Sequence, residues 1–262
     1  MTTKTQTTAL PETTDKELDT LLYLYKFRFI HTNQFQKLFK HKVPQTVQEW
    51  LKKLKNKGYV IAHDFNDTNH NGFIVRTKPT IYSLTKLARK KLKDYPTCEI
   101  EELDRVYQEK DVSESFINRF IFITDVYLNM LSQIGGQEKL HFSTQANLRG
   151  FEYFPTPMVD TFIAIKSPKK TKRYFLVLID GRKPWLVQDN IIKQYTDYTD
   201  NNAWSDYSKD PLPTFLIICP NEQRKKHFYD LISNSLTNGS FYLATKFEIQ
   251  ESGFKADWQQ VK

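Results

Sequence analysis

The feature that most constrains the fold is a change in the spacing of apolar residues at Gly58. Before this glycine, apolar side chains recur every three or four residues, which predicts helices. The first begins at Asp15 and includes the segment LDTLLYLYKFRFI, and a second, capped by His31-Thr32-Asn33, runs through Phe39. Pro44 suits the first turn of a third helix, because the backbone N–H that proline lacks has no partner there.

The predicted third helix has two chemically different faces. The face expected to be buried carries Val47, Trp50, Leu51 and Leu54. The opposite face carries Gln45, Thr46, Gln48, Glu49, Lys52, Lys53 and Lys55. This outer face is polar and basic, so it suits contact with a polar partner better than burial.

After Gly58 the pattern becomes that of strands. The segment YVIAHDF, a polar turn from Asn66 to Gly72 and a return ending in TIYSLT predict a β-hairpin. Thr85 can cap a last helix, Lys86 to Leu92. The run from KNKGYVIAHDF to IYSLTKLARKKL resembles the end of many winged helix-turn-helix domains, and the resemblance covers residues 15–95. The alternative is a small helical domain used for protein contact.

The positive charge of the chain is confined to its first part. The formal net charge is +8, yet residues 1–98 hold 18 Lys and Arg against 8 Asp and Glu, whereas residues 99–262 hold 20 against 22. A basic excess in one domain is expected of a module that binds phosphates, because each neutralised phosphate releases condensed counterions. A solvated lysine surface is the alternative.

Double-stranded DNA is therefore the expected partner. Side chains early on the third helix would reach base edges, and later lysines and the last helix would contact phosphates. The expected DNA-binding residues are Gln45, Thr46, Gln48, Lys52, Lys53, Lys55, Arg89, Lys90 and Lys91.

Two other classes of protein are disfavoured by the sequence. Residues 1–14, expected to be a disordered tail, lack the apolar segment of a signal peptide, and no later run is long enough to span a membrane. A cytoplasmic protein without a membrane partner is expected. Cys98 and Cys219 stand far apart without other ligands at metal-binding spacing, so we expect small buried hydrophobes rather than a disulfide or a zinc site.

A second domain is predicted for residues 113–252, after a linker helix over 96–112 and before a C-terminal tail over 253–262. Asp111-Val112-Ser113-Glu114 resembles a capping box that opens a long amphipathic helix, which Gly135-Gly136 ends. The elements predicted after it are strands near Lys139 to Arg149, Val159 to Ile165 and Arg173 to Asp180, a helix from Trp185 to Thr199, a strand from Thr214 to Cys219, a helix from Glu222 to Leu236 and a strand from Phe241 to Ile249.

The predicted fold class is α+β. The order αβββαβαβ of the second domain is the core order of restriction-endonuclease-like domains of the PD-(D/E)xK type, although fold order alone never establishes an activity. The chain is thus expected to join a winged helix-turn-helix domain to an α/β nuclease-like domain.

Several short motifs resemble those of one family. The helix ESFINRFIFITDVYLNML, the strand FSTQANLR, the pair Val159-Asp160, the strand FLVLIDGRKP and the helix IIKQYTDY together resemble the replication-relaxation family. The resemblance spans nearly the whole chain. It implies a protein of plasmids or related mobile elements, with a winged helix and a nuclease-like domain, that acts in replication or DNA relaxation.

The resemblance also implies a set of site residues. The aspartate of the family's Pro-Asp turn corresponds to Asp160, although Val159 replaces the proline, and the second acidic position of its Glu-x-Asp strand corresponds to Asp180. The family's helical lysine and tyrosine correspond to Lys193 and Tyr195. The implied catalytic residues are therefore Asp160, Asp180 and Lys193.

Two departures from the family pattern put catalysis in doubt. The glutamate of Glu-x-Asp falls on Leu178, and a glutamate often found on the first strand falls on Gln145. Metal-assisted phosphodiester hydrolysis needs hard oxygen ligands to hold Mg²⁺, and leucine supplies none. We expect a degenerate site without a cofactor. If the site is active, Asp160 and Asp180 would share one Mg²⁺, with Arg182, Lys183 or Lys193 near the phosphate.

Other residues leave alternatives open. The aspartates at 160 and 180 also suit turns, as acidic residues commonly do. The basic segment Lys166 to Arg173 would contact a DNA backbone or form a solvated hairpin tip. Trp204, Tyr207 and Trp258 would stack on bases or on a partner, with buried packing favoured.

The sequence thus predicts a DNA-binding protein of a mobile element, with a degenerate nuclease-like domain that serves assembly or further DNA contact. A homodimer is one assembly left open. The alternatives are an Mg²⁺-dependent endonuclease or nickase, and a winged-helix transcriptional regulator whose second domain only dimerises.

Overall fold

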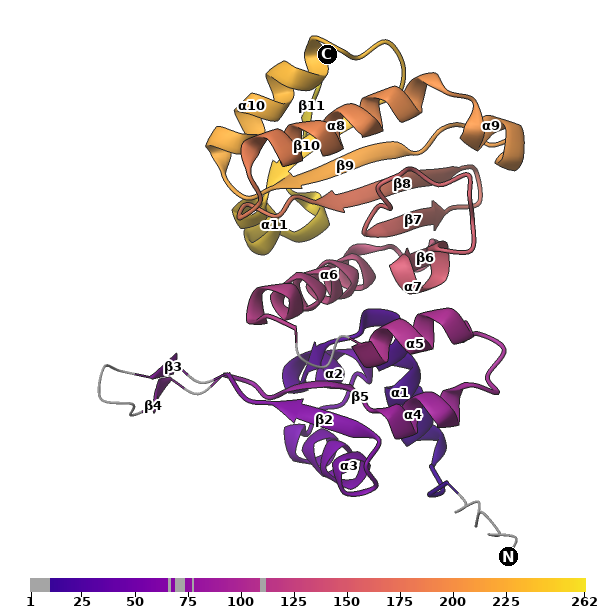
Figure 1. Ribbon diagram of the computed structural model, residues 1–262, viewed down its shortest axis with the longest axis vertical. Helices are drawn as coiled ribbons and strands as arrows, with labels where there is room; N and C mark the ends of the chain where they lie inside the picture. Colours follow the sequence, from indigo (N-terminus) through magenta and orange to yellow (C-terminus); the bar gives the residue numbers. More distant parts are fainter. Residues whose placement is uncertain (1–9, 66, 69–73, 77, 109–111) are drawn as a thin grey trace, which may run out of the picture. The chain divides into compact units, whose positions relative to one another are not determined.

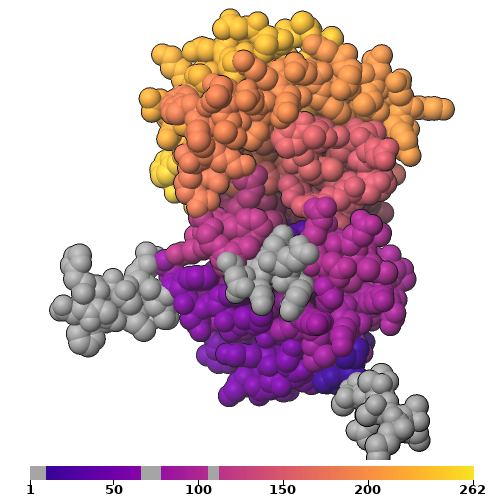
Figure 2. Space-filling view, viewed as in Figure 1, coloured from indigo at the N-terminus to yellow at the C-terminus, as the bar shows by residue number. Residues whose placement is uncertain are grey.

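The computed structural model describes residues 10–65, 67–68, 74–76, 78–108 and 112–262 (Figure 1). The chain divides into two compact units, Met1–Thr124 and Asp125–Lys262. The division falls inside one helix, α6 (Glu114–Gln133), and so later in the chain than the boundary at 113 expected from the sequence. Figure 2 shows the surfaces of the two units in the colours of the sequence.

The first unit begins with three helices separated by one short strand. Their bounds are α1 (Asp15–Phe27), β1 (Ile30–His31), α2 (Thr32–Leu38) and α3 (Pro44–Asn56). Thr14 caps α1 and His31 caps α2, where its ring Nδ1 accepts a hydrogen bond of 3.2 Å from the Gln34 N–H. The first helix is shorter than predicted, because Arg28 takes a positive φ of 64° and the next residues turn into β1.

A three-stranded antiparallel sheet follows the helices in the first unit. It has the order β1-β5-β2, with β2 (Val60–His63) and β5 (Ile81–Leu84). Between them, β3 (Asp67–Thr68) pairs with β4 (Ile74–Arg76), and most of the predicted turn from Asn66 to Gly72 lies outside the described residues. Thr85 caps α4 (Lys86–Leu92), as predicted, and α5 (Ile100–Gln108) falls within the expected linker helix.

The core of the first unit combines apolar residues from its helices. Leu21, Leu24, Phe35 and Leu54 are fully buried. Trp50 was predicted to point inward but is only half-buried, and its ring contacts Phe39 and His41 edge-on. Of the expected tail 1–14, residues 1–9 lie outside the described residues, while the Pro11 carbonyl accepts a hydrogen bond from the Tyr59 hydroxyl.

The second unit is built on a six-stranded mixed sheet in the order β11-β10-β9-β8-β7-β6. Strands β6, β7 and β8 pair antiparallel, β8, β9 and β10 pair parallel, and β11 is antiparallel to β10. The bounds are β6 (Lys139–Thr144), β7 (Thr161–Lys166), β8 (Thr171–Leu178), β9 (Thr214–Cys219), β10 (Phe241–Thr245) and β11 (Gln259–Gln260). The molecule is therefore of the α+β class, as predicted.

Two long helices cover one face of this sheet. Alternate residues of β8, β9 and β10, among them Phe175, Phe215 and Phe241, form a core with Ile192 of α8 (Trp185–Asp200) and Phe228 of α10 (Glu222–Ser233). The second half of α6 and the short helix α11 (Lys246–Ser252) lie on the other side of the sheet (Figure 1). The Gln133 side chain of α6 donates a 3.2 Å hydrogen bond to the Ser252 carbonyl of α11.

Two predicted strands of the second unit need correction, and one helix was missed. The strand expected from Lys139 to Arg149 ends at Thr144, because residues 145–148 form the short helix α7 (Gln145–Leu148). The strand expected from Phe241 to Ile249 ends at Thr245, which forms a capping box with Glu248 and opens α11. The helix α9 (Ala203–Ser208) was not predicted.

The expected C-terminal tail over 253–262 is folded. A short 3-10 helix, Gly253–Lys255, precedes β11, which pairs with β10 through Tyr242 and Leu243. Val261 is buried against the core of the unit. The last residues therefore belong to the sheet.

Candidate functional site

The outer face of α3 is largely exposed. Val47, Leu51 and Leu54 are each at most 1% exposed, so the predicted inward face is buried. The side chains that the sequence assigned to the outside are exposed, except for Thr46, which is partly covered: Gln45, Gln48, Lys52, Lys53 and Lys55. Pro44 occupies the first turn, as expected.

The lysines of this face have uncommitted charge. In the part of the chain that the structure describes, Lys52, Lys53 and Lys55 form no ion pair. Lys57, which follows the helix, differs because its ammonium group lies 2.7 Å from a Glu17 carboxylate oxygen. The three lysines of α3 can therefore meet an external anion without first breaking an internal contact.

Helix α4 contributes less positive charge than the sequence suggests. Arg89 lies 2.7 Å from the Asp104 carboxylate of α5, so its charge is already balanced within the unit. Lys90 is exposed and Lys91 partly exposed. Of the basic residues expected to contact DNA from this helix, the two lysines are better placed than the arginine.

In the second unit, the chain brings Asp160 next to Leu178. The Asp160 carboxylate accepts a 2.7 Å hydrogen bond from the Leu178 N–H, and the Asp160 N–H donates to the Leu176 carbonyl at 3.0 Å. Asp160 is only 3% exposed and Leu178 only 7%. The two positions that the family resemblance assigned to metal ligands thus do lie side by side, but one of them carries an apolar side chain.

Asp180 is committed to the loop that follows β8. Its carboxylate accepts hydrogen bonds from the Arg182 N–H at 3.1 Å and from the Arg182 guanidinium at 3.0 Å. Its carbonyl accepts a 3.2 Å hydrogen bond from the Gln188 side chain at the start of α8. The acidic group therefore stabilises a turn, which is one of the two interpretations that the sequence allows.

Of the remaining residues of the resemblance, Gln145 lies near Asp160, because Thr144 pairs with Thr161, whereas Lys193 and Tyr195 have other surroundings. Lys193 is exposed on α8 and contacts neither aspartate within the described residues. Tyr195 is 2% exposed and its ring packs on Phe215 in the core. Gln145 stands in the first turn of α7, where its side chain donates a hydrogen bond to the Met158 carbonyl.

Both aspartates are engaged in contacts within the chain. Among the described residues, no three His, Cys, Asp or Glu side chains converge to hold a metal ion. Magnesium requires near-octahedral oxygen ligands, whereas the Asp160 carboxylate caps a backbone N–H and the Asp180 carboxylate binds an arginine.

Solved structures that are similar to the chain include two of a restriction endonuclease. One is the restriction endonuclease FokI, with a TM-score of 0.36, 15% sequence identity and coverage of 93% of this chain and 45% of that one. The other is FokI bound to DNA, with a TM-score of 0.35, 14% identity and the same coverage. This chain spans about half the length of those two chains. No family model and no curated protein matches it.

Two further sequence-based expectations can be compared with the structure. Cys98 and Cys219 are both free and buried, as predicted, and burial raises the pKa of each thiol. No helix in the described ranges is long and apolar enough to cross a bilayer.

The sequence did not predict that one group of aromatic side chains lies together. Tyr174, Tyr242, Phe254 and Trp258 surround a pocket in the second unit, although they are spread over more than 80 positions of the chain. The sequence draws attention only to Trp258, as a residue that would stack or be buried. The alternation of strand residues assigns each tyrosine to a face, but only the pairing of β8, β9 and β10 makes them neighbours.

Proposed function

We propose that this chain binds double-stranded DNA through α3 and that its first unit is a winged helix-turn-helix domain. The observation that carries the proposal is the exposed, polar and basic face of α3 opposite a buried apolar face. The order α1, β1, α2, α3, β2, β5 and the antiparallel sheet β1-β5-β2 support it. In a helix-turn-helix, the second helix of the pair enters the major groove.

The chemistry of α3 changes along its length in the way this interpretation requires. Gln45, Thr46 and Gln48 lie in the first turns, from which recognition helices contact base edges, and glutamine can make paired hydrogen bonds with adenine. Lys52, Lys53 and Lys55 lie later and suit phosphates, which fix the position of the protein without reading sequence. Lys90 and Lys91 would add backbone contacts from α4.

We further propose that the second unit is a nuclease-like domain whose active site is degenerate. Its antiparallel β6-β7-β8 followed by α8 and the parallel β9 supports the first part. Leu178 beside Asp160 supports the second, because the position adjacent to the first acidic residue lacks an oxygen ligand. A role in replication or relaxation of a plasmid or other mobile element, or in its control, is proposed from the family resemblance.

The first test is the salt dependence of duplex binding. We expect the affinity of the full-length protein for a labelled duplex, measured by fluorescence anisotropy, to fall steeply as the salt concentration rises. Lys52→Ala should lower the slope of log K against log salt by about 0.9, the value for one phosphate that is no longer neutralised. Lys226→Ala is the matched control, because Lys226 is also exposed but lies on α10 of the second unit. Equal slopes for the two variants would contradict the assignment of α3.

The second test is sequence preference. Selection of bound duplexes from a random pool should yield a preferred site for the wild type. Gln48→Ala should relax that preference at one or two positions, and removing one paired set of hydrogen bonds to a base should reduce discrimination by about 1–3 kcal/mol. Lys53→Ala should weaken binding to all DNA sequences by the same factor. If the lysine variant changes the preferred site and the glutamine variant does not, α3 is docked in another register.

A further inference from the structure

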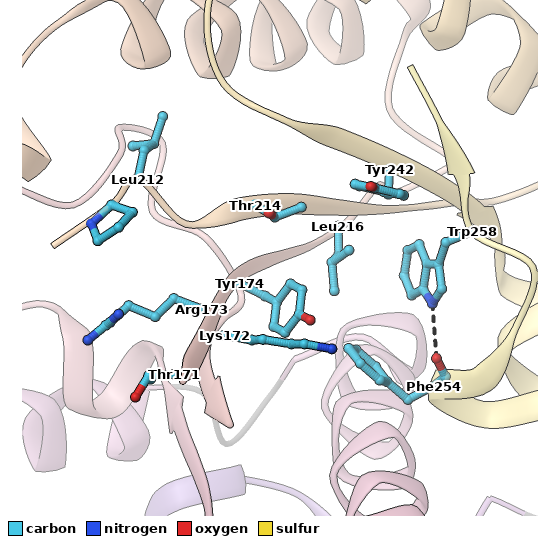
Figure 3. A pocket seen from close by; sticks show the side chains of 11 residues that line it. Thr171, Lys172, Arg173, Tyr174, Leu212, Thr214, Leu216, Tyr242, Phe254 and Trp258 are labelled. Atoms are coloured by element: carbon cyan, nitrogen blue, oxygen red, sulfur yellow. Dashed lines mark hydrogen bonds between the residues drawn. The ribbon is translucent and has the colours of Figure 1, made fainter. Parts of the chain in front are cut away.

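A pocket of about 460 Å³ opens in the second unit where β8 and β9 begin (Figure 3). It is independent of the Asp160 site, because Asp160 contacts the other end of β8 at Leu178. β8 has eight residues, and at roughly 3.3 Å per residue its two ends are about 23 Å apart. The pocket size falls within the range of roughly 300–1,000 Å³ that is typical of small-ligand sites.

The floor of the pocket follows from strand alternation. Phe175, Phe215 and Phe241 point to the α8 and α10 face, so the neighbouring residues of the same strands point the other way. The register pairs Leu216 with Tyr242, and Tyr174 lies on the same face two residues before Leu176, the partner of Leu216. Tyr174 and Tyr242 are therefore half-buried on a face that α6 and α11 leave uncovered here.

The C-terminal segment supplies the wall. The Phe254 ring meets the Tyr174 ring edge-on, with centroids 5.7 Å apart, and the Trp258 indole N–H donates a 3.1 Å hydrogen bond to the Phe254 carbonyl. Pairing of β11 with β10 holds this segment at the sheet. Four aromatic rings from separate parts of the chain thus surround one space.

The lining of the pocket carries one lysine and one arginine. Lys172 is exposed, and its side chain runs beside Tyr174 toward Phe254 (Figure 3). It forms no ion pair with any described residue, whereas the neighbouring Arg173 points away from the aromatic rings and lies 2.7 Å from the Asp210 carboxylate. None of the eleven described residues that line the pocket is acidic.

From this geometry we infer that the pocket binds one unpaired nucleotide. Its base stacks between the aromatic side chains, and its phosphate meets the Lys172 ammonium group. Aromatic rings bind bases of any sequence through their flat faces, and a lysine near such rings provides a point charge for phosphate. The nucleotide is either free or part of a single DNA strand. The inference goes beyond duplex binding by α3 and does not depend on it.

The test uses calorimetric titration of the full-length protein with deoxyadenosine monophosphate and with deoxyadenosine. Lys172→Ala should lower the affinity for the monophosphate roughly tenfold, as expected for loss of one charge-assisted hydrogen bond, and should leave the affinity for the nucleoside unchanged. Lys169→Ala is the matched control: Lys169 is exposed in the same hairpin but does not line the pocket. Tyr242→Leu should weaken both ligands roughly tenfold, because the ring that stacks on the base is removed. Far-ultraviolet circular dichroism and thermal unfolding check that each variant is folded.

The source of the nucleotide is distinguished by a labelled adenine dodecamer in single-stranded and duplex form. Loss of single-strand affinity in Lys172→Ala, with duplex affinity kept, supports a base of a single strand. Unchanged single-strand affinity, with weaker monophosphate binding, supports a free nucleotide. Lys52→Ala should lower only the affinity for the duplex. Failure of the α3 proposal can therefore be distinguished from failure of the pocket proposal. The inference is overturned if the monophosphate does not bind at millimolar concentration, if Lys172→Ala and Lys169→Ala behave alike, or if nucleoside and monophosphate bind equally.

Discussion

The buried ion pair between Arg28 and Glu102 offers a sharp test of how the first unit is held together. Arg28 follows the last residue of α1, and Glu102 lies on α5. Their side chains are 2% and 4% exposed, and the Arg28 guanidinium also lies 5.5 Å from the centre of the Phe120 ring. Replacing Glu102 by glutamine removes the negative charge and leaves the arginine charge buried.

The expected loss of stability is large. Removing one partner of a buried ion pair costs about 3–5 kcal/mol, because the other charge stays in a poorly solvated site. The ion pair between Lys78 and Glu114 provides the control, since its side chains are 37% and 47% exposed. An exposed pair contributes about 0–1 kcal/mol. Glu102→Gln should therefore destabilise the unit by roughly 3 kcal/mol more than Glu114→Gln.

Urea unfolding monitored by amide hydrogen exchange measures this difference in the free energy of unfolding. Peptides from 1–124 report the first unit and peptides from 125–262 the second, so the two transitions are separated. The double variant Arg28→Met with Glu102→Leu should recover most of the lost stability, because neither charge is then buried. The reasoning is refuted if Glu102→Gln is no more destabilising than Glu114→Gln, or if the double variant is as unstable as the single one.

Three further predictions concern the site, a thiol and the dependence on pH. Purified protein should not nick supercoiled plasmid in Mg²⁺ or Mn²⁺, because Leu178 stands where the family resemblance implies an oxygen ligand; nicking that disappears in Asp160→Asn would contradict this. Burial raises the pKa of the Cys219 thiol to about 12, so iodoacetamide at about pH 8 should modify it in urea but not in the native protein. Although burial raises the pKa of the Glu17 carboxyl, hydrogen bonds from Lys57 and Thr14 outweigh it and hold that pKa below its ordinary value of 4.5. The stability that Glu17 provides over Glu17→Gln is therefore full above that value and is lost as pH falls through the lower, folded pKa; a difference that does not shrink in acid would contradict the shift.

The elements that the sequence determined are those whose limits depend on neighbouring residues. Pro44 begins α3, and Gly58, with a φ of +77°, ends the turn after it. The Thr85 side chain caps α4 by accepting hydrogen bonds from two backbone N–H groups, and the bounds of α4 agree with the prediction. Proline, a positive-φ glycine and a capping hydroxyl act within four residues, so their effect is visible in the sequence alone.

Tertiary structure decided what depends on distant residues. Helix α1 ends at Phe27 rather than further on, Arg28 forms an ion pair with Glu102, and Arg89 is paired with Asp104. The neighbouring positions of Asp160 and Leu178, and the pocket beside Lys172, follow from strand register. Register is set by the packing of whole strands and their side-chain faces, because a shift of one residue would turn every core side chain outward. No local pattern in the sequence contains that information.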